Sequence, residues 1–400
     1  MSEKFDQIKA REEQLLCRSY SRYPIAIHSG NMSHLTDVDG KEYVDLLAGI
    51  AVAAVGHCNP EICAVLAEQS HKLWHVSNLF YQEEQLELAS LLLQTTHHDK
   101  VFFCNSGAEA NEACIKLARR YMQEVRHADR YEIITLSNCF HGRTLATLAA
   151  TGRENLSRGF GPLPAGFKQV PCQDLAALKA SITEHTAAVM LEVVQGEAGV
   201  IPLDHAYLKG VEALCREQGI LLICDEVQAG FCRTGTFWAF QQHDLKPDIM
   251  STAKALANGL AMGCMLATNE VAKGFEPGSH ATTFGGGALV SKVASKTIEI
   301  MLRDNLAARA AEVGTRLKAR LDTIQKAYPK LIKEVRGQGL MLGIEFYKDG
   351  PKVWEELLQR GFICSLSHNA NLRLLPALNI PESDLEAFCT TLEAICAQHN

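Results

Sequence analysis

The sequence predicts an α/β protein in which a mostly parallel sheet lies between layers of helices. From about residue 56 onwards, helical segments alternate with short apolar segments of strand length, an alternation that is typical of parallel sheets covered by helices on both faces. The chain has 400 residues, of which 47% are hydrophobic and 21% are charged. This composition is that of a soluble globular protein with a sizeable core and two or three domains.

The first elements form a separate group. Residues 1 to about 20 are predicted to be a charged helix, and residues 25–52 a small meander with a turn at Asp37–Gly40. The alternating part follows, with helices predicted at 60–74, 83–95, 107–123, 174–184 and 204–218, and strands at 100–104, 132–136, 187–193, 219–224, 248–250 and 263–267.

The pattern changes again near residue 288. A long amphipathic helix is predicted to run to about 327 with a break near Arg303 and Asp304, and strands and shorter helices follow, ending in a helix at 382–398. These segments indicate a compact α+β domain. We therefore predict an N-terminal segment (1–55) that packs with a small domain, a large domain (56–290) and a C-terminal small domain (291–400).

Bulk composition argues against several classes of protein. The net charge is −7 without a basic cluster, which disfavours nucleic-acid binding. The sequence contains no uninterrupted apolar run of membrane-spanning length and no signal-peptide core near its charged beginning. The 14 cysteines form no C-x-x-C pair and show no zinc-like spacing, so we expect free thiols, no metal site and a cytoplasmic location.

Two charged residues stand in apolar surroundings. Asp225 ends the apolar run 219–224, and Lys254 is the only charged residue between Asp248 and Glu270. A lysine in such surroundings is costly to hold charged, so its pKa is expected below the usual value, which suits Schiff-base chemistry. The pair suggests a pyridoxal-phosphate enzyme, but a strand-end aspartate that caps the next segment, or a structural ion pair, explains the same residues.

A turn of small residues follows the predicted strand 100–104. The segment Asn105–Glu112 opens a helix, with Ser106 or Asn105 as N-cap and Glu109 as its capping-box partner. Exposed N–H groups at such a helix start suit a phosphate, although a well-capped helix without a ligand fits equally. No Walker loop and no G-x-G-x-x-G motif is present, so a nucleotide is not implied.

Three further segments have a functional and a plain structural interpretation. Phe140 either stacks on a flat ligand or belongs to the core, and Arg143 either clamps a carboxylate or is solvated. Glu197 interrupts an apolar stretch, where it is solvated or pairs with a distant cation. The segment His280–Gly287 contains threonine hydroxyls followed by a run of glycines. It is either a phosphate contact or a flexible connector.

In order and spacing, these segments resemble the class III (ω-amino acid) aminotransferases of the fold-type I pyridoxal-phosphate superfamily, and most closely the acetylornithine aminotransferases of arginine biosynthesis. The resemblance covers nearly the whole chain, from Asp37–Tyr43, Leu47–Val52 and Gly56–His57 to Val335–Gly343 and Leu372–Pro376. It implies a large domain whose mostly parallel seven-stranded sheet lies between helices. It also implies a small α+β domain formed by the C-terminal part and the N-terminal segment.

The resemblance also implies residue roles. Lys254 resembles the Schiff-base lysine and Asp225 the partner of the pyridine nitrogen. The other cofactor contacts that it implies are Ser106, Gly107 and Ala108 at the phosphate, Phe140 stacked on the ring, Val227 and Gln228 beside the ring and its phenolic oxygen, and Thr283 at the phosphate of the neighbouring subunit. The substrate contacts that it implies are Arg143 at the α-carboxylate, Thr282, the gate pair Glu197 and Arg373, and Tyr20.

The implied reaction transfers the ω-amino group of N2-acetyl-L-ornithine to 2-oxoglutarate, giving N-acetyl-L-glutamate 5-semialdehyde and L-glutamate by a ping-pong mechanism. Because Thr283 serves the neighbouring subunit, the resemblance implies a homodimer with shared active sites. Related ornithine aminotransferases carry a tyrosine at the position of Ile50, so Ile50 and Arg143 favour an N-acylated substrate. Ornithine, succinylornithine, N-succinyl-diaminopimelate and 4-aminobutyrate remain alternative substrates, and a non-catalytic binding protein of the same fold remains an alternative class.

Overall fold

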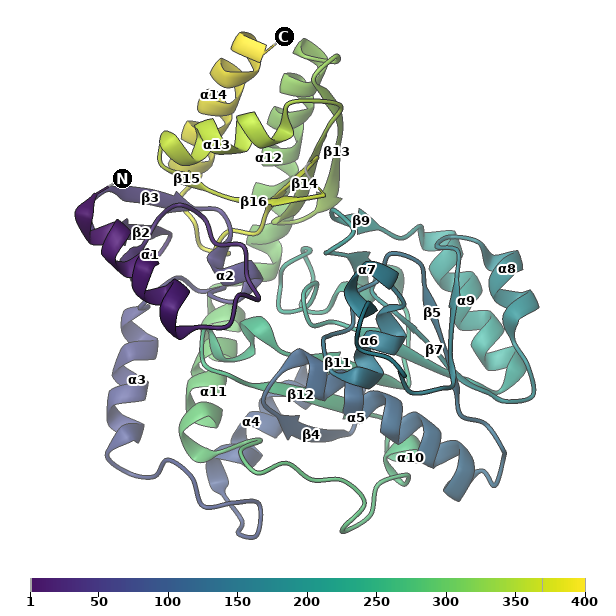
Figure 1. Ribbon diagram of the computed structural model, residues 1–400. Helices are drawn as coiled ribbons and strands as arrows, with labels where there is room; N and C mark the ends of the chain where they lie inside the picture. Colours follow the sequence, from purple (N-terminus) through teal and green to yellow (C-terminus); the bar gives the residue numbers. More distant parts are fainter. Residues whose placement is uncertain (1, 369, 400) are drawn as a thin grey trace.

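A seven-stranded sheet forms the centre of the protein in a computed structural model that describes residues 2–368 and 370–399 (Figure 1). The strand order is β4-β12-β11-β10-β7-β5-β6. The strands are β4 (Lys100–Cys104), β5 (Glu132–Leu136), β6 (Phe167–Val170), β7 (Thr186–Leu191), β10 (Leu221–Asp225), β11 (Ile249–Thr252) and β12 (Gly263–Ala267). Strand β12 pairs antiparallel with both neighbours, and the other pairings are parallel. The predicted mostly parallel seven-stranded sheet is confirmed.

Strands β7, β10, β11 and β12 of this sheet are buried throughout, which explains why they are short apolar runs. In β7, Val189 and Leu191 belong to one core cluster, whereas Ala188 and Met190 belong to another. Successive strand side chains point to opposite faces, so the two clusters mark the two sides of the sheet. Helix α5 (Gly107–Arg120) contributes to one cluster, and α4 (Glu83–Gln94), α9 (His205–Gln218) and α11 (Ala288–Arg303) contribute to the other.

Shorter helices and turns complete this part of the chain. Helix α5 continues into a π-helical turn, Tyr121–Val125. The remaining helices here are α3 (Pro60–Ser70), α6 (Leu145–Thr151), α7 (Glu154–Ser157), α8 (Leu175–Ser181) and α10 (Asn269–Ala272), together with the 3₁₀ turns Ala239–His243 and Lys254–Ala257. A small hairpin of β8 (Val194–Gln195) and β9 (Ile201–Pro202) leaves the sheet after β7.

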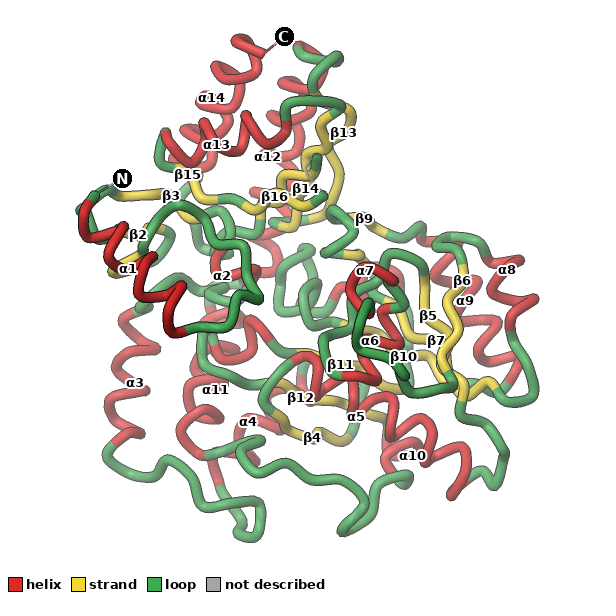
Figure 2. Tube along the Cα trace, in the orientation of Figure 1, coloured by secondary structure: helices red, strands yellow, loops and turns green. Residues whose placement is uncertain are grey.

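The C-terminal part forms an antiparallel sheet with helices, visible as the upper group of elements in Figure 2. Its strand order is β13-β14-β17-β16. The strands are β13 (Ile332–Gln338), β14 (Met341–Phe346), β16 (Ser365–Ser367) and β17 (Asn371–Leu374), and the helices are α12 (Leu306–Ala327), α13 (Gly350–Gln359) and α14 (Glu382–His399). The predicted helix break is confirmed, because α11 and α12 are separate and Asn305 between them has a φ of +47°.

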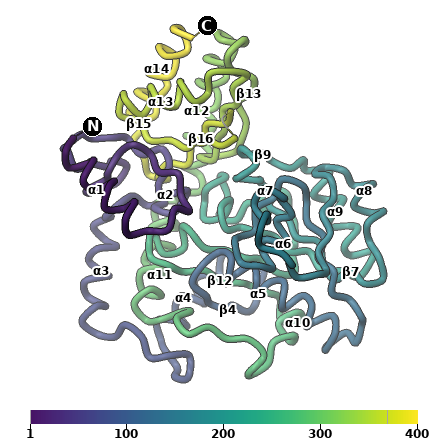
Figure 3. Tube along the Cα trace, in the orientation of Figure 1, coloured from purple at the N-terminus to yellow at the C-terminus, as the bar shows by residue number. Residues whose placement is uncertain are grey.

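The two ends of the chain share a sheet. Strands β1 (Ile27–Asn31), β2 (His34–Asp37) and β3 (Glu42–Asp45) are joined by β15 (Phe362–Ile363), which pairs with β3. The N-terminal segment, which also contains α1 (Glu3–Leu15) and α2 (Ala48–Ala51), therefore lies beside the C-terminal part (Figure 3). The exact domain boundaries stay a prediction.

Several predicted limits were wrong by a turn or more. The first helix ends at Leu15, and the helix that was expected to reach residue 74 ends at Ser70. Strand β6 and helix α6 were not predicted, since β6 is a sheet edge with half-buried or exposed polar residues. In the part of the chain that the structure describes, no helix has both the length and the hydropathy of a transmembrane span.

Candidate active site

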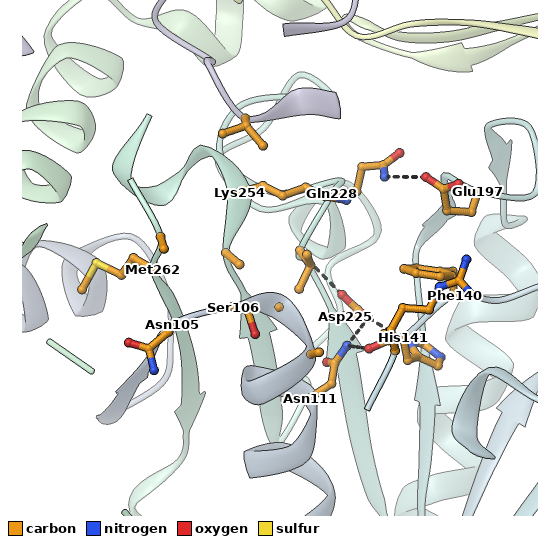
Figure 4. Close-up of a pocket in the computed structure, with 18 of the residues that line it drawn as sticks. Asn105, Ser106, Asn111, Phe140, His141, Glu197, Asp225, Gln228, Lys254 and Met262 are labelled. Carbon is orange, nitrogen blue, oxygen red and sulfur yellow. Dashed lines mark hydrogen bonds and ion pairs between the residues drawn. The ribbon is translucent and has the colours of Figure 1, made fainter. Parts of the chain in front are cut away.

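A cavity of about 440 Å³ opens beside the ends of β4, β10 and β11 (Figure 4). Its volume lies within the range of about 300–1,000 Å³ that is common for small-molecule sites. Ligands of open α/β sheets bind at the carboxyl ends of the strands. The cavity is lined by ten of the residues singled out from the sequence: Ser106, Gly107, Ala108, Phe140, Arg143, Glu197, Asp225, Val227, Gln228 and Lys254.

Asp225, the last residue of β10, is fixed as a hydrogen-bond acceptor. Its Oδ2 accepts from Asn111 Nδ2 at 2.7 Å and faces His141 Nδ1 at 2.8 Å, while Oδ1 accepts from the backbone N–H of Val227 at 3.0 Å. The side chain is buried, so these donors replace water around the charge. Asp225 makes no ion pair with Lys254 among the residues that the structure describes; its charged partner is His141.

His141 lies beneath this carboxylate and is itself buried. Burial favours the neutral imidazole, but Cys139 and Asp225 beside the ring outweigh that effect and raise the pKa of His141 well above its ordinary value. We therefore assign the positive charge next to Asp225 to His141.

Lys254 projects into the same cavity from a strained backbone position. It starts the 3₁₀ turn after β11 and has a φ of +45°, in the left-handed region that non-glycine residues rarely adopt. Burial lowers the pKa of Lys254, although Glu197 and Asp225 act in the opposite direction. A lysine amine with a lowered pKa is available as a nucleophile and as a base.

The turn at Ser106 presents backbone donors to the cavity. Ser106 is the N-cap of α5, and its Oγ accepts from the N–H of Glu109 at 3.2 Å. The N–H groups of Gly107 and Ala108, in the first turn of the helix, have no intrahelical acceptor. A Cβ at position 107 would lie 2.7 Å from Val227 Cγ1, so the glycine is required there. These donors and the positive end of the helix suit an anion such as phosphate.

Phe140 lies across Asp225 from Ser106 in Figure 4, and Arg143 lines the same cavity. The Arg143 guanidinium carbon lies 5.7 Å from the centre of the Phe140 ring. The backbone N–H of Phe140 donates to Glu192 Oε1 at 2.9 Å. An aromatic face and a cation therefore border one cavity.

Glu197, which lines the cavity, forms an ion pair with Arg373. Arg373 Nη1 donates to Glu197 Oε1 at 2.6 Å and to the backbone oxygen of Gly196 at 3.3 Å, and Nε donates to Ser365 Oγ at 3.0 Å. Arg373 is buried, whereas Glu197 is partly exposed. Burial tends to raise the pKa of Glu197, but Arg373 outweighs this and lowers it, so the carboxylate is charged and neutralises the arginine.

Besides Arg373, which pairs with Glu197 but does not itself line the cavity, three of the predicted residues lie away from it within one chain. Tyr20 is 77% exposed and lies in a separate groove against α1. Thr282 accepts a hydrogen bond from Asn105 Nδ2 at 3.0 Å, and Thr283 is exposed. None of these three side chains lines the cavity of its own chain.

Sequence reasoning missed Asn111, His141 and Glu192, which also line the cavity. Asn111 lies one helical turn beyond Gly107, so helix periodicity could have placed it on the same face. Glu192 follows β7, and its two oxygens accept from the N–H groups of Phe140 and Gly196 at 2.9 and 3.2 Å. Burial, together with Asp225 nearby, raises the pKa of Glu192 to about 7.

The donor and acceptor set fits pyridoxal phosphate. The cavity offers an amine at Lys254, a buried carboxylate at Asp225, free N–H groups at a helix start and an aromatic face at Phe140. Buried Gln228 Oε1 has no hydrogen-bond partner within the described residues, so it can serve a ligand. No group of three or more potential metal ligands occurs in residues 2–368 and 370–399.

Comparisons with known proteins agree on one family. The model of the aminotransferase class-III family matches residues 16–396. An acetylornithine aminotransferase of Methanocaldococcus jannaschii is 41% identical over 387 residues, which are 96% of this chain and 96% of that protein. An ornithine aminotransferase of Toxoplasma gondii superposes with a TM-score of 0.96 at 29% identity, covering 99% and 95% of the two chains. An acetylornithine aminotransferase of Elizabethkingia anophelis superposes with a TM-score of 0.88 at 30% identity, covering 98% and 99%.

Proposed function

The chain belongs to the class-III aminotransferase family, and we propose that it transfers the ω-amino group of N2-acetyl-L-ornithine to 2-oxoglutarate. The observation that carries the proposal is the Glu197–Arg373 pair at 2.6 Å beside a cavity that both Glu197 and Arg143 line. Among the described residues, Arg143 faces the cavity without a carboxylate partner, whereas Arg373 behind Glu197 is neutralised internally. Such an arrangement suits two substrates that differ by one carboxylate. The names of relatives about 40% identical to this chain support the acetylated donor.

The cofactor would be held by groups at both ends of the cavity. Lys254 would bind its aldehyde carbon, Asp225 its ring nitrogen, and the N–H groups of Gly107 and Ala108 its phosphate. Ser106 would add its hydroxyl at the phosphate, while Phe140, Val227 and Gln228 would contact the ring. When bound, pyridoxal phosphate supplies an electron sink for the negative charge that develops on the substrate carbon.

Asp225 and Lys254 divide the chemical work. The carboxylate, oriented by Asn111 and next to His141, would hold a proton on the ring nitrogen. The amine of Lys254, whose pKa is lowered by burial, would take the proton from the substrate carbon that carries the ω-amine.

The arginines select the substrates. Arg143 binds the α-carboxylate of N2-acetylornithine while Glu197 keeps Arg373 neutralised. When L-glutamate or 2-oxoglutarate enters, its second carboxylate replaces Glu197 on Arg373. One cavity therefore serves both half-reactions, and the acetyl group removes the positive charge of the α-amine that free ornithine would bring near Arg143.

We also propose a homodimer with shared active sites. Several large apolar side chains are exposed in the loop 71–82, which follows α3, and beside it. They are Trp74, Leu79, Phe80, Tyr81 and Phe284. Leu79 is 86% exposed and Tyr81 is fully exposed, and monomers rarely leave such clusters open. The His75 ring lies 5.1 Å from the Phe284 ring, next to Thr282 and Thr283, so a second copy on this surface would meet both threonines. This supports Thr283 as a phosphate contact of the other copy, with Thr282 near its substrate. The substrate contact of Tyr20 stays a prediction. A cytoplasmic location stays a prediction.

A panel of amino donors with 2-oxoglutarate as acceptor tests the substrate. The panel contains N2-acetylornithine, ornithine, succinylornithine, N-succinyl-diaminopimelate and 4-aminobutyrate. N2-acetylornithine is expected to give the highest kcat/KM, about tenfold or more above that of ornithine. The free α-amine of ornithine would bring an unpaired positive charge near Arg143, and an unpaired buried group costs about that much. A higher kcat/KM for ornithine would contradict the acetylornithine assignment and favour the ornithine aminotransferases, which are also among the similar structures. The variant Lys254→Ala serves as the inactive control.

A further inference from the structure

The turn that carries Glu197 is held at both ends by the antiparallel sheet β13-β14-β17-β16, which we call the small-domain sheet. Residues Gly196–Gly199 form the tip of the β8–β9 hairpin, which we call the gate turn. Arg373 on β17 donates to the backbone oxygen of Gly196, at the beginning of the gate turn. Arg336 on β13 donates from Nε to the backbone oxygen of Gly199, at its end, at 2.9 Å. Two arginines therefore clamp the two ends of one turn.

The clamp follows from strand register. Arg336 lies opposite Gly343, and Gly343 lies opposite Arg373, so the three residues form one row across β13, β14 and β17. Residues directly opposite on neighbouring strands project from the same face of a sheet. The row therefore faces the gate turn with Arg336 and Arg373 on either side of Gly343, which has no side chain.

Gly343 supplies the gap that lets the gate turn approach. A Cβ at position 343 would lie 2.8 Å from the backbone oxygen of Gly199 and 3.2 Å from Val200 Cβ. A Cβ at position 199 would in turn lie 2.9 Å from Arg336 Nη2, and Gly199 has a φ of +102°. The contact between gate turn and sheet thus depends on the absence of side chains at both positions.

Arg336 is itself rigidly held. Its Nη1 donates to Glu334 Oε2 at 2.7 Å and to Glu345, and its Nη2 donates to Asn371 Oδ1 at 2.6 Å. The side chain is only 11% exposed. These hydrogen bonds from Nη1 and Nη2 fix the plane of the guanidinium group, so that Nε points at the gate turn. Arg373 binds the Glu197 side chain, whereas the contacts of Arg336 within the described residues are with Gly199, Glu334, Glu345 and Asn371. Arg336 can therefore stay in place when the Glu197–Arg373 pair opens.

We propose that Arg336 is a positioning residue that holds the gate turn on the small-domain sheet and thereby sets how readily Glu197 closes on Arg373. This inference rests on the proposed function, in which Glu197 must cover Arg373 for the ω-amino donor and release it for the dicarboxylate. Loss of the Arg336 contact leaves the gate turn tethered at one end only. Glu197 then competes less well with a ligand carboxylate for Arg373, so donor use falls while dicarboxylate binding strengthens.

The test compares Arg336→Gln with Arg316→Gln in the holoenzyme. Arg316 also binds two glutamates, Glu312 and Glu382, but lies on α12 and makes neither contact with the gate turn. In Arg336→Gln, Glu345 keeps its bond to Lys333 at 2.7 Å, which limits the damage to the sheet. Calorimetric titration with glutarate, which carries two carboxylates but neither amine nor keto group, measures access to Arg373 without turnover. Stopped-flow half-reactions with N2-acetylornithine and with L-glutamate measure the two uses of the site.

Arg336→Gln is expected to bind glutarate about three- to tenfold more tightly and to lose about tenfold in the donor half-reaction, as for one charge-assisted hydrogen bond. The L-glutamate half-reaction should not slow. Arg316→Gln should match the wild type. Gly343→Ala, which pushes the gate turn away from the same face of the sheet without removing a charge, should weaken the donor half-reaction and strengthen glutarate binding in the same way. It tests the positioning role if Arg336→Gln does not fold.

Equal losses in both half-reactions with an unchanged glutarate Kd would overturn the positioning role. That result differs from a failure of the proposed function itself, in which the wild-type protein would react with no amino donor. A wild type that transaminates normally while both variants behave like it would also overturn the inference.

Discussion

Replacing Asp225 by asparagine tests the electrostatic part of the mechanism, because the change keeps the shape of the side chain and removes its charge. Asp225 Oδ2 meets the donors of Asn111 and His141, and Oδ1 meets the N–H of Val227. An asparagine places its NH₂ group against one of these two sides and loses at least one hydrogen bond. The expected loss of stability is about 1–3 kcal/mol, the cost of leaving one or two buried donors unpaired. The expected loss in kcat is larger, about a hundredfold to a thousandfold, as for other preorganised electrostatic groups.

Single-turnover rates with N2-acetylornithine measure the chemical effect, and denaturant titration measures stability. The raised pKa of His141 depends in part on Asp225. A raised histidine pKa contributes stability that is present at low pH and is lost as pH rises through the folded pKa. In Asp225→Asn that dependence should weaken, and NMR titration should show a lower His141 pKa.

The matched control is Asp248→Asn. Asp248 precedes β11 at the opposite edge of the sheet, where its Oδ2 accepts from the N–H of Leu222 at 2.8 Å, a bond that an asparagine oxygen can also accept. This variant should keep full activity. If Asp225→Asn turned over within about threefold of the wild type, the carboxylate would not be the partner of the ring nitrogen, and the reasoning about preorganised charge would be refuted.

Three further changes probe the gate, the core and the proposed dimer. Glu197→Gln leaves Arg373 buried without a neutralising charge, so kcat/KM for N2-acetylornithine should fall about tenfold or more while that for L-glutamate stays within about twofold; a parallel fall in both would count against the gate. Burial raises the pKa of Glu226 to about 7, so wild-type stability should fall as pH rises from the ordinary glutamate range to about 7. Glu226→Gln should flatten that slope in denaturant titrations, and an unchanged slope would exclude Glu226 as its source. Tyr81→Asp places a charge in the exposed apolar cluster, so sedimentation analysis should show monomers and the activity should be low. A stable Tyr81→Asp dimer would place the interface elsewhere.

Much of the central sheet could be predicted because its strands are buried on both faces. Segments such as Leu221–Asp225 and Gly263–Ala267 are entirely buried, so each stands out as a short apolar run between helices. The edge strand Phe167–Val170 was missed because one face of it meets solvent and its middle residues are polar. Local sequence cannot separate such an edge from a loop.

The site was predictable where a polar residue breaks an apolar run, as Asp225 and Lys254 do. Asn111 and Glu192 were not found, because a polar residue inside a helix or just after a strand is usually solvated, and only tertiary packing turns these two inward. The row of Arg336, Gly343 and Arg373 was invisible for another reason. It depends on the register of three strands, which the sequence does not specify by itself.

We propose that this cavity binds pyridoxal phosphate and passes an amino group between two substrates. Visible absorbance of the purified protein during alternate additions of N2-acetylornithine and 2-oxoglutarate tests both steps together. The yellow colour should fade with the donor and return with the acceptor, and it should neither fade nor return in Lys254→Ala. A wild-type protein that is yellow but never fades with any amino donor would show that the cavity does not transfer an amino group.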